Sequence, residues 1–422
     1  MQSNSLRISE VKDTINFIIN NNEELAKKGK RRIAVNIVGE RGIGKTSVIE
    51  QIAKERHMGY TKVALSQLEE IGDLIGFPCK EFEAQLFKVE KQADGTIKRT
   101  PLKLVWGNEN TFKSLNPNMY KFTGNTRMGY AKPSWVPKYN ENGNIVLLDD
   151  WTRCTPVFVN AIMDMIKDQE YMSWKLPEKT MILLTSNPDN GAYNVSNLDA
   201  AQEGRYLDFT MEFNIDDWAQ WAEKAGMDGR AINFALAYSD ELFGMDDQGN
   251  SIADPRRFEM FSNVISGVAD WEKPDSLSFI FNVAKGCFND AQNKFGTMFT
   301  TFIKNRMHAM IQPKQMLEGK WETVQEKMHS TIYSSDGQYH PAIASVLERR
   351  FANYVNAWLD SDEQTPIRLV KDRILDFIRT EKLGTPLFTE DLIFHMIKTI
   401  TSDHKAQTGK LLYDPEIAQK VI

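Results

Sequence analysis

Gly39-Glu40-Arg41-Gly42-Ile43-Gly44-Lys45-Thr46 has the spacing G-x-x-x-x-G-K-[ST], which is typical of a loop that binds phosphate groups. Glycines allow such a loop to turn several backbone N–H groups inward onto one small arc. Lys45 would place a cation on the β- and γ-phosphates of a nucleotide, and the Thr46 hydroxyl would bind Mg²⁺. With Ser47, which follows directly, this stretch is the first candidate for nucleotide binding.

The residues on both sides of the loop fit the same interpretation. Ile33–Val38 is an apolar run typical of a buried strand. After the loop, apolar residues recur at helical spacing, namely Val48, Ile49, Ile52 and Ala53. The helix would point its positive N-terminal end at the phosphates. Strand, loop and helix thus follow in the order that the motif requires, and the alternative is a glycine-rich turn without a ligand.

Two further apolar runs end in polar side chains. Asn144–Leu148 leads into Asp149 and Asp150, and Met181–Ser186 leads into Asn187. In an open α/β sheet, ligands bind at the carboxyl ends of the strands. We expect Asp149 to hold Mg²⁺, Asp150 to orient or deprotonate an attacking water, and Asn187 to position the same water. The alternative for Asn187 is a simple turn former.

The composition is that of an ordinary globular chain. Its 422 residues are 41% hydrophobic and 26% charged, with a net charge of −6, and the length predicts two or three domains. This net charge argues against a protein whose whole surface binds nucleic acid, although a local basic patch would not be visible in the net charge. Three widely spaced cysteines indicate a reducing compartment, and no apolar stretch approaches membrane-spanning length. We expect a soluble, cytoplasmic protein with no membrane partner.

Residues 80–143 are expected to form a largely irregular insertion. It contains one predicted hairpin, in which Leu86–Val89 pairs with Ile97–Val105. Aromatic and basic side chains mix there, including Trp106 and Arg127. Such a mixture would suit a nucleic-acid or peptide strand, and the alternative is a solvated insertion with no partner.

From Asp216 onward the chain is predicted to be helical almost to its end. Asp254-Pro255-Arg256-Arg257 begins a helix with two basic residues in its first turn, where the helix dipole disfavours cations, so an anionic ligand is indicated. The predicted organisation is a nucleotide-binding α/β domain over residues 1–213, a helical domain over 214–315 and a helical C-terminal region over 316–422.

Taken together, the motifs resemble those of the AAA+ ATPases, and within them the MoxR-like group. The resemblance runs from about residue 30 to about residue 270 and rests on an ordered set of motifs: Gly39–Thr46, Asp73–Pro78, Pro133–Pro137, Leu148–Arg153, Thr185–Pro188, Arg205 and Asp254–Arg256. It implies a five-stranded parallel sheet between helices, followed by an α-helical lid. It also implies ring-forming subunits, typically hexamers, that use ATP and Mg²⁺ to remodel protein partners, often with a partner that carries a von Willebrand factor A domain.

The resemblance also assigns three residue roles. Asn187 is similar to sensor 1, Arg205 to the arginine finger that reaches the γ-phosphate of a neighbouring subunit, and Arg256 to sensor 2 of the lid. Arginine suits the finger role because its charge is fixed and the donors of its planar guanidinium group match the spacing of phosphate oxygens. The alternative is that Arg205 only pairs with a nearby acid such as Asp208 or Glu203.

One position departs from the family pattern. Asp150 stands where the family usually has glutamate, so its carboxylate is one methylene shorter, and slow hydrolysis is expected. Three functions stay open at this point: an ATP-driven remodelling ATPase, a nucleic-acid-handling AAA+ motor, and a nucleotide-gated assembly module that hydrolyses rarely. A simple P-loop kinase would not explain Arg205 followed by a helical lid.

Overall fold

The computed structural model describes residues 5–91, 97–188, 204–245, 251–290, 292–359, 367–379, 381–382, 385–403 and 408–421. The chain divides into two compact units. The first comprises Met1–Leu6, Glu10–Glu40 and Gly44–Met211; the second comprises Arg7–Ser9, Arg41–Ile43 and Glu212–Ile422. Each unit is described by itself.

A parallel sheet forms the centre of the first unit. Among the described residues it has six strands in the order β1-β11-β2-β10-β7-β3. The bounds are β1 (Ser5–Leu6), β2 (Ala34–Val38), β3 (Gly59–Ala64), β7 (Asn144–Asp149), β10 (Thr180–Ser186) and β11 (Tyr206–Met211). The expected count of five strands is wrong, because β1 adds a sixth strand that pairs with β11. Two residues are too few to show an alternating apolar pattern in the sequence.

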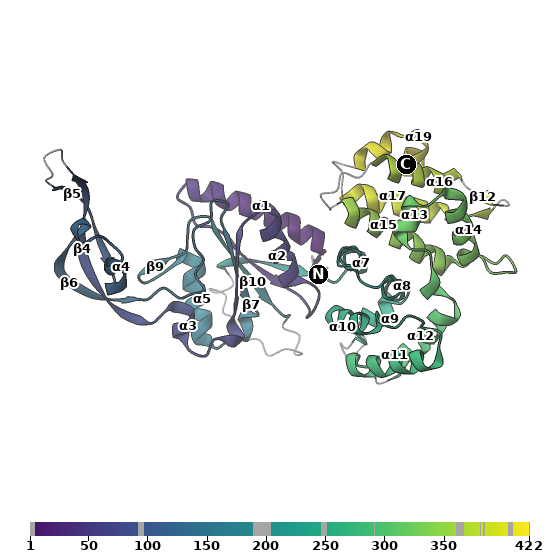
Figure 1. Ribbon diagram of the computed structural model, residues 1–422, viewed down its shortest axis with the longest axis horizontal. Coiled ribbons are helices and arrows are strands. Elements are labelled where there is room, and N and C mark those ends of the chain that lie inside the picture. Colours follow the sequence, from purple (N-terminus) through teal and green to yellow (C-terminus); the bar gives the residue numbers. More distant parts are fainter. Residues whose placement is uncertain are drawn as a thin grey trace. The chain divides into compact units, whose positions relative to one another are not determined.

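Helices cover both faces of this sheet (Figure 1). On one face, α1 (Ile8–Lys27) lies against α2 (Lys45–Glu55), with Lys12 of α1 paired to Glu55 of α2 at 2.8 Å. The other face buries α5 (Pro156–Asp168) in an apolar cluster with every second residue of the central strands, such as Val146 and Leu148 of β7. The short helix α3 (Ile71–Ile75) adds Leu74 to that cluster.

The insertion is a second sheet and not an irregular segment. It consists of β4 (Pro78–Lys91), β5 (Ile97–Gly107) and β6 (Tyr120–Tyr130), antiparallel in the order β5-β4-β6, with α4 (Glu109–Lys113) packed on it. The predicted hairpin is confirmed, since Val89 pairs with Arg99 and Phe87 with Pro101. The third strand was missed because nearly all of β6 is exposed and therefore carries no apolar alternation. A two-residue pair, β8 (Glu170–Tyr171) and β9 (Trp174–Lys175), forms a separate hairpin.

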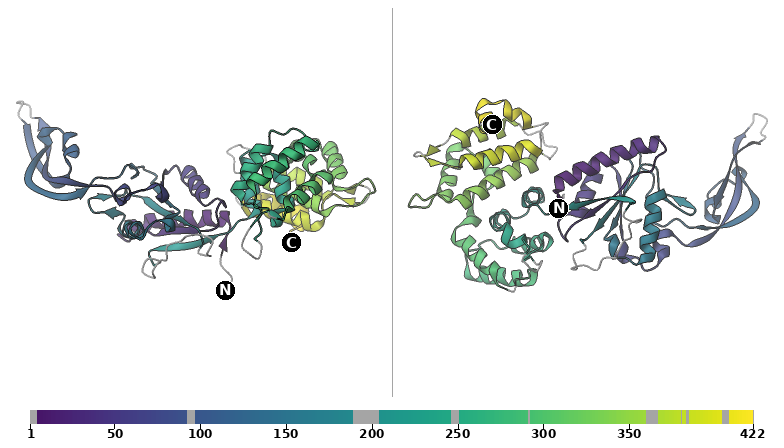
Figure 2. Two further views of the ribbon diagram at one scale, coloured as in Figure 1. Left: turned by 90° about the horizontal axis from the view of Figure 1, so that it is seen from below. Right: turned by 180° about the vertical axis from the view of Figure 1, so that it is seen from behind.

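In its described residues the second unit has helices as its regular structure, apart from the two-residue pair β12 (Glu381–Lys382) and β13 (Thr385–Pro386) (Figure 2). One apolar cluster runs through it, and α15 (Pro341–Leu359) lies at its centre with thirteen buried residues. The other helices are α7 (Ile215–Lys224), α8 (Gly229–Ala237), α9 (Ser239–Phe243), α10 (Pro255–Ile265), α11 (Pro274–Cys287), α12 (Lys294–Lys304), α13 (Pro313–Glu318), α14 (Trp321–Ile332), α16 (Ile367–Arg379), α17 (Glu390–Asp403) and α19 (Pro415–Gln419). None of the helices in the described part of the chain combines the length and apolar character needed to span a bilayer.

Candidate functional site

The glycine-rich loop joins β2 to α2, so strand, loop and helix stand in the predicted order. Gly42 and Gly44 have φ angles of 82° and 99°, in the left-handed region that favours glycine. The N–H of Gly39 donates to the carbonyl of Ser186, which ties the start of the loop to the end of β10. Gly44 is the N-terminal cap of α2, and no side chain caps this helix end. The loop therefore has the backbone that a phosphate cradle requires.

Lys45 lies inside this loop with only 8% of its surface exposed. Its ammonium donates to the carbonyls of Gly39 at 2.5 Å and Glu40 at 2.9 Å, and to Oδ1 of Asn187 at 3.2 Å. Asn187 at the end of β10 thus contacts the loop lysine directly. Carbonyl and amide oxygens thus hold the buried ammonium beside the loop, at a position from which it could contact an anion.

Asp149, the last residue of β7, lies beside the start of α2. Its Oδ1 accepts hydrogen bonds from the hydroxyls of Thr46 at 3.1 Å and Thr185 at 2.6 Å. Its Oδ2 lies 2.7 Å from the ammonium of Lys62 on β3. Burial alone would raise the pKa of Asp149, but its three donors outweigh that effect and hold the pKa below the ordinary value of 3.8. Asp149 is therefore an anion adjacent to the threonine hydroxyl.

Asp150 has a left-handed backbone, with φ 52° and ψ 39°, which is uncommon for a residue other than glycine and is found at functional sites. Its backbone N–H donates to Oγ1 of Thr185 at 3.2 Å, and this contact helps to fix the turn. Its carboxylate accepts a long hydrogen bond of 3.4 Å from Asn187 and lies 3.8 Å from Arg153. Asn187 consequently lies between Lys45 and Asp150.

A buried polar network below these residues was not predicted. Asn36 in the middle of β2 accepts from Trp151 Nε1 at 3.1 Å and donates to Ser186 Oγ at 3.0 Å and to Asp208 at 2.7 Å. Trp151, which directly follows Asp150, is fully buried. The network joins β2, β10, β11 and the turn after β7. The one sequence signal was a polar Asn36 inside an otherwise apolar strand.

The remaining predicted site residues make none of these contacts. Ser47 is exposed in the first turn of α2. Arg41, Gly42 and Ile43 are the middle of the loop itself and are grouped with the second unit, as is Arg256 in the first turn of α10. Arg205 precedes β11 and pairs with Asp164 of α5 at 3.5 Å. Of the acids considered for pairing with Arg205, Glu203 lies outside the described residues.

The donor set fits a magnesium–nucleotide complex. Thr46 and Asp149 offer one hydroxyl and one carboxylate, and Mg²⁺ is commonly bound by one or two carboxylates together with substrate phosphates. Among the described residues, no cluster of three or more His, Cys, Asp or Glu side chains could hold a metal ion by itself. Fold and site together define an α/β protein whose glycine-rich loop has the backbone geometry of a phosphate cradle.

No known family model matches the chain, and no curated protein matches it. Several solved structures are similar to it. The RuvB Holliday junction branch migration motor of Thermotoga maritima is 12% identical, with a TM-score of 0.31, over 64% of this chain and 68% of that one. A point mutant of Thermotoga maritima RuvB is 13% identical, with a TM-score of 0.33, over 66% and 72%. A Cytophaga hutchinsonii protein described as a candidate ATPase is 12% identical, with a TM-score of 0.28, over 66% and 86%. Similarities this low carry no argument about activity.

Proposed function

We propose that the protein is an ATP-binding and ATP-hydrolysing AAA+ ATPase of the MoxR-like kind, which assembles into a ring and remodels protein partners. The observation that carries the enzymatic part of this proposal is the meeting of Lys45, the Thr46–Asp149 pair and the Asn187–Asp150 pair. Lys45 and Thr46 begin α2, directly after the loop that follows β2, and the other residues stand at or just after the ends of β7 and β10. These three strands are neighbours in the parallel sheet, and their carboxyl ends lie at one edge of it. This edge is where ligands bind in open α/β sheets.

Each residue has a role that follows from its chemistry. The loop amides and Lys45 would bind the phosphates, and Thr46 with Asp149 would hold Mg²⁺. Bound Mg²⁺ would neutralise charge on the phosphate oxygens. Asp150 would orient or deprotonate the attacking water, with Asn187 positioning the same water from its place between Lys45 and Asp150. The short side chain of Asp150 supports slow hydrolysis, so a nucleotide-gated assembly module that rarely turns over is a limiting form of the same function.

The assembly part of the proposal rests on the resemblance. Arg205 would act as the arginine finger in a neighbouring subunit, and Arg256 would report the nucleotide state from the lid. We propose a hexamer as the ring and a von Willebrand factor A domain protein as a partner. The resemblance also supports a helical lid over residues 214–315 and a separate C-terminal region over 316–422.

One observation favours a second candidate, a motor that handles nucleic acid. The sequence from the start of β4 to the end of β6, residues 78–130, holds nine lysines and arginines but five acids, although the whole chain has a net charge of −6. Large apolar side chains are exposed on the same sheet, among them Leu104 and Phe122 at 55% and 47%. Basic and aromatic side chains together suit a single strand of nucleic acid.

A stimulated ATPase assay tests the proposal. The purified chain should hydrolyse ATP in the presence of Mg²⁺, and a protein partner captured with the Asp150→Asn variant, then purified, should stimulate the rate. Stimulation by single-stranded DNA or RNA instead would favour the motor, and tight ATP binding with negligible turnover would favour the assembly module. A chain that neither binds nor hydrolyses ATP would refute all three.

A further inference from the structure

Lys62 contacts the predicted magnesium site but belongs to none of its motifs. Its ammonium lies 2.7 Å from Oδ2 of Asp149, while both hydroxyl donors use Oδ1 of the same carboxylate. The pairing register explains this contact, because β3 and β7 are parallel neighbours and Lys62 stands opposite Leu147, two residues before Asp149. The two hydroxyls and the Lys62 ammonium are thus all hydrogen-bond donors to Asp149, and of the three only Lys62 carries a charge.

A cation at this position opposes the binding of another cation. Mg²⁺ and the Lys62 ammonium would both seek an oxygen of Asp149, and their like charges would repel each other at a separation of a few ångströms. The side chain of Asp149 is only 18% exposed, so water screens this repulsion less than it would at an open surface. Metal binding must then weaken or break the Lys62–Asp149 pair.

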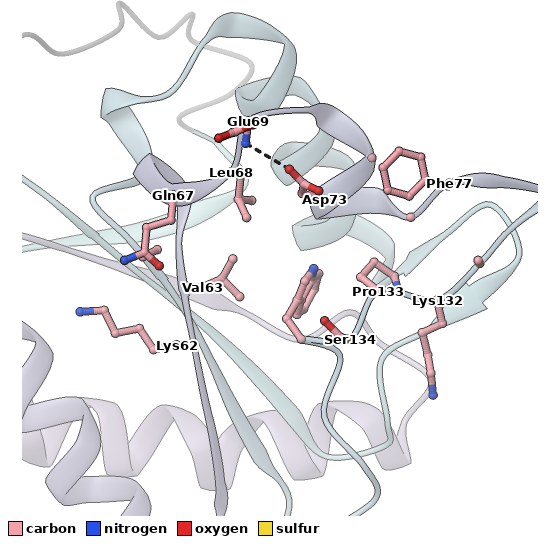
Figure 3. Close-up of a pocket in the computed structure, with 15 residues that line it drawn as sticks. Lys62, Val63, Gln67, Leu68, Glu69, Asp73, Phe77, Lys132, Pro133 and Ser134 are labelled. Atoms are coloured by element: carbon pink, nitrogen blue, oxygen red, sulfur yellow. Dashed lines mark hydrogen bonds between the residues drawn. The ribbon is translucent and has the colours of Figure 1, made fainter.

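Lys62 has room to leave. Its side chain is 41% exposed, and β3 is the outermost strand at its end of the sheet among the described residues. Lys62 also lines an open groove of about 710 Å³, bounded by the end of β3, α3 and the segment 131–135. Figure 3 shows Lys62 and Gln67 on one side of this groove, with Phe77 and Pro133 on the other. The ammonium can turn toward this open groove without any displacement of the core.

We propose that Lys62 is a positioning residue that competes with Mg²⁺ for Asp149 and thereby sets the metal affinity of the nucleotide site. Without metal, Lys62 holds the carboxylate beside Thr46; when metal binds, Lys62 turns into the groove. This inference rests on the proposed function, since it requires a magnesium–nucleotide complex at Asp149. The alternative is that the Lys62–Asp149 ion pair only stabilises the outermost strand, β3. Loss of the pair would then lower the stability of the fold and leave the metal affinity unaltered.

The first test measures metal affinity directly. Mn²⁺ is titrated into the protein saturated with ADP, and free Mn²⁺ is followed by electron paramagnetic resonance. Lys62→Met should bind Mn²⁺ about three- to tenfold more tightly than the wild type, because a partly exposed competing charge has been removed. Lys62→Arg keeps the charge and should stay within about twofold of the wild type. As a matched control, Lys12→Met removes a 2.8 Å ion pair with Glu55, away from Asp149, and should change nothing.

A second measurement uses the wild-type chain, so it does not depend on the folding of a variant. Acylation of lysines by a water-soluble ester is followed by mass spectrometry with ADP, before and after Mg²⁺ is added. Labelling of Lys62 should rise when the metal frees its ammonium, while labelling of Lys12 should not. Unchanged labelling of Lys62, or unchanged Mn²⁺ affinity of a folded Lys62→Met, would overturn the inference. A wild-type chain that binds no ADP would instead refute the proposed function.

Discussion

Lys45 is the residue on which nucleotide binding should depend most. Its ammonium is held over the loop by the carbonyls of Gly39 and Glu40, where the phosphates would arrive. We expect Lys45→Ala to abolish ATP binding at ordinary concentrations, because a charged hydrogen bond to phosphate contributes about 1.5–3 kcal/mol and lysine makes more than one. Titration with a fluorescent ATP analogue measures this. Lys54→Ala, on the exposed face of α2, is the control, and unchanged binding by Lys45→Ala would show that the loop is only a turn.

Asp150 should govern turnover and not binding. Asp150→Asn removes the carboxylate but keeps the shape, so ATP binding should persist while hydrolysis nearly stops. Asp150→Glu restores the length that the family uses and should raise the rate above that of the wild type. Steady-state phosphate release from both variants measures this. Wild-type hydrolysis by Asp150→Asn would remove Asp150 from the water-positioning role.

At the scale of single residues, the sequence predicted the site residues that directly follow an apolar run. It missed the side-chain contacts that depend on how the strands pair. The loop, Asp149 and Asn187 could be found because each follows directly from an apolar run. The contact of Lys62 with Asp149 could not, because it depends on the register between two strands that are eighty residues apart in the chain. The hydrogen bond between Asn36 and Trp151 was hidden for the same reason.

At the scale of elements, strongly patterned segments were predicted well. The helix expected after the loop is α2, and the three apolar runs around the site are strands β2, β7 and β10. The sixth strand and β6 were missed, because neither buries one face in a regular alternation. The exposed sheet of the insertion is held mainly by its hydrogen-bond ladder and by the aromatic contacts of Phe112.

The packing of α17 on α15 should depend on pH. Glu348 on α15 is fully buried and lies 3.1 Å from Nδ1 of His395 on α17. The hydrogen bond to Glu348 raises the pKa of His395 above its ordinary value of 6.5. A raised histidine pKa means that the folded chain binds a proton more tightly than the unfolded chain. Its stabilising contribution is therefore complete below pH 6.5 and is lost as the pH rises through the raised pKa.

Thermal unfolding of the wild type between pH 5.5 and about pH 8.5 tests this dependence, and the expected change in stability is about that of one histidine. The melting temperature should fall as the pH rises, and His395→Gln should flatten that dependence. His340→Gln, which alters another histidine of the same unit, should keep the wild-type slope. An unaltered slope in His395→Gln would show that the proton is bound elsewhere.

At the scale of the whole molecule, the position of Arg205 bears on how subunits would cooperate. In the register between β11 and β2, Tyr206 stands opposite Ala34, whereas the loop begins after Val38. Arg205 therefore lies at the amino ends of these strands, whereas the loop of its own subunit lies at their carboxyl ends. Five residues of strand separate the two ends, or about 16 Å, which exceeds the reach of an arginine side chain. Arg205 should thus act on the nucleotide of a neighbouring subunit.

This geometry predicts that two inactive variants restore activity to each other. Arg205→Ala should bind ATP but hydrolyse it poorly, whereas Lys45→Ala cannot bind ATP yet still carries the finger. In a mixed ring, an intact loop can stand beside an intact Arg205, so hydrolysis should recover in part. Because a finger contributes about 10³–10⁵ in rate, even a small productive fraction is measurable.

Asp164→Ala removes only the acid paired with Arg205 and should keep wild-type activity, which separates a finger from a structural ion pair. If the two variants co-assemble by size-exclusion chromatography but no mixing ratio restores hydrolysis, the shared site is refuted.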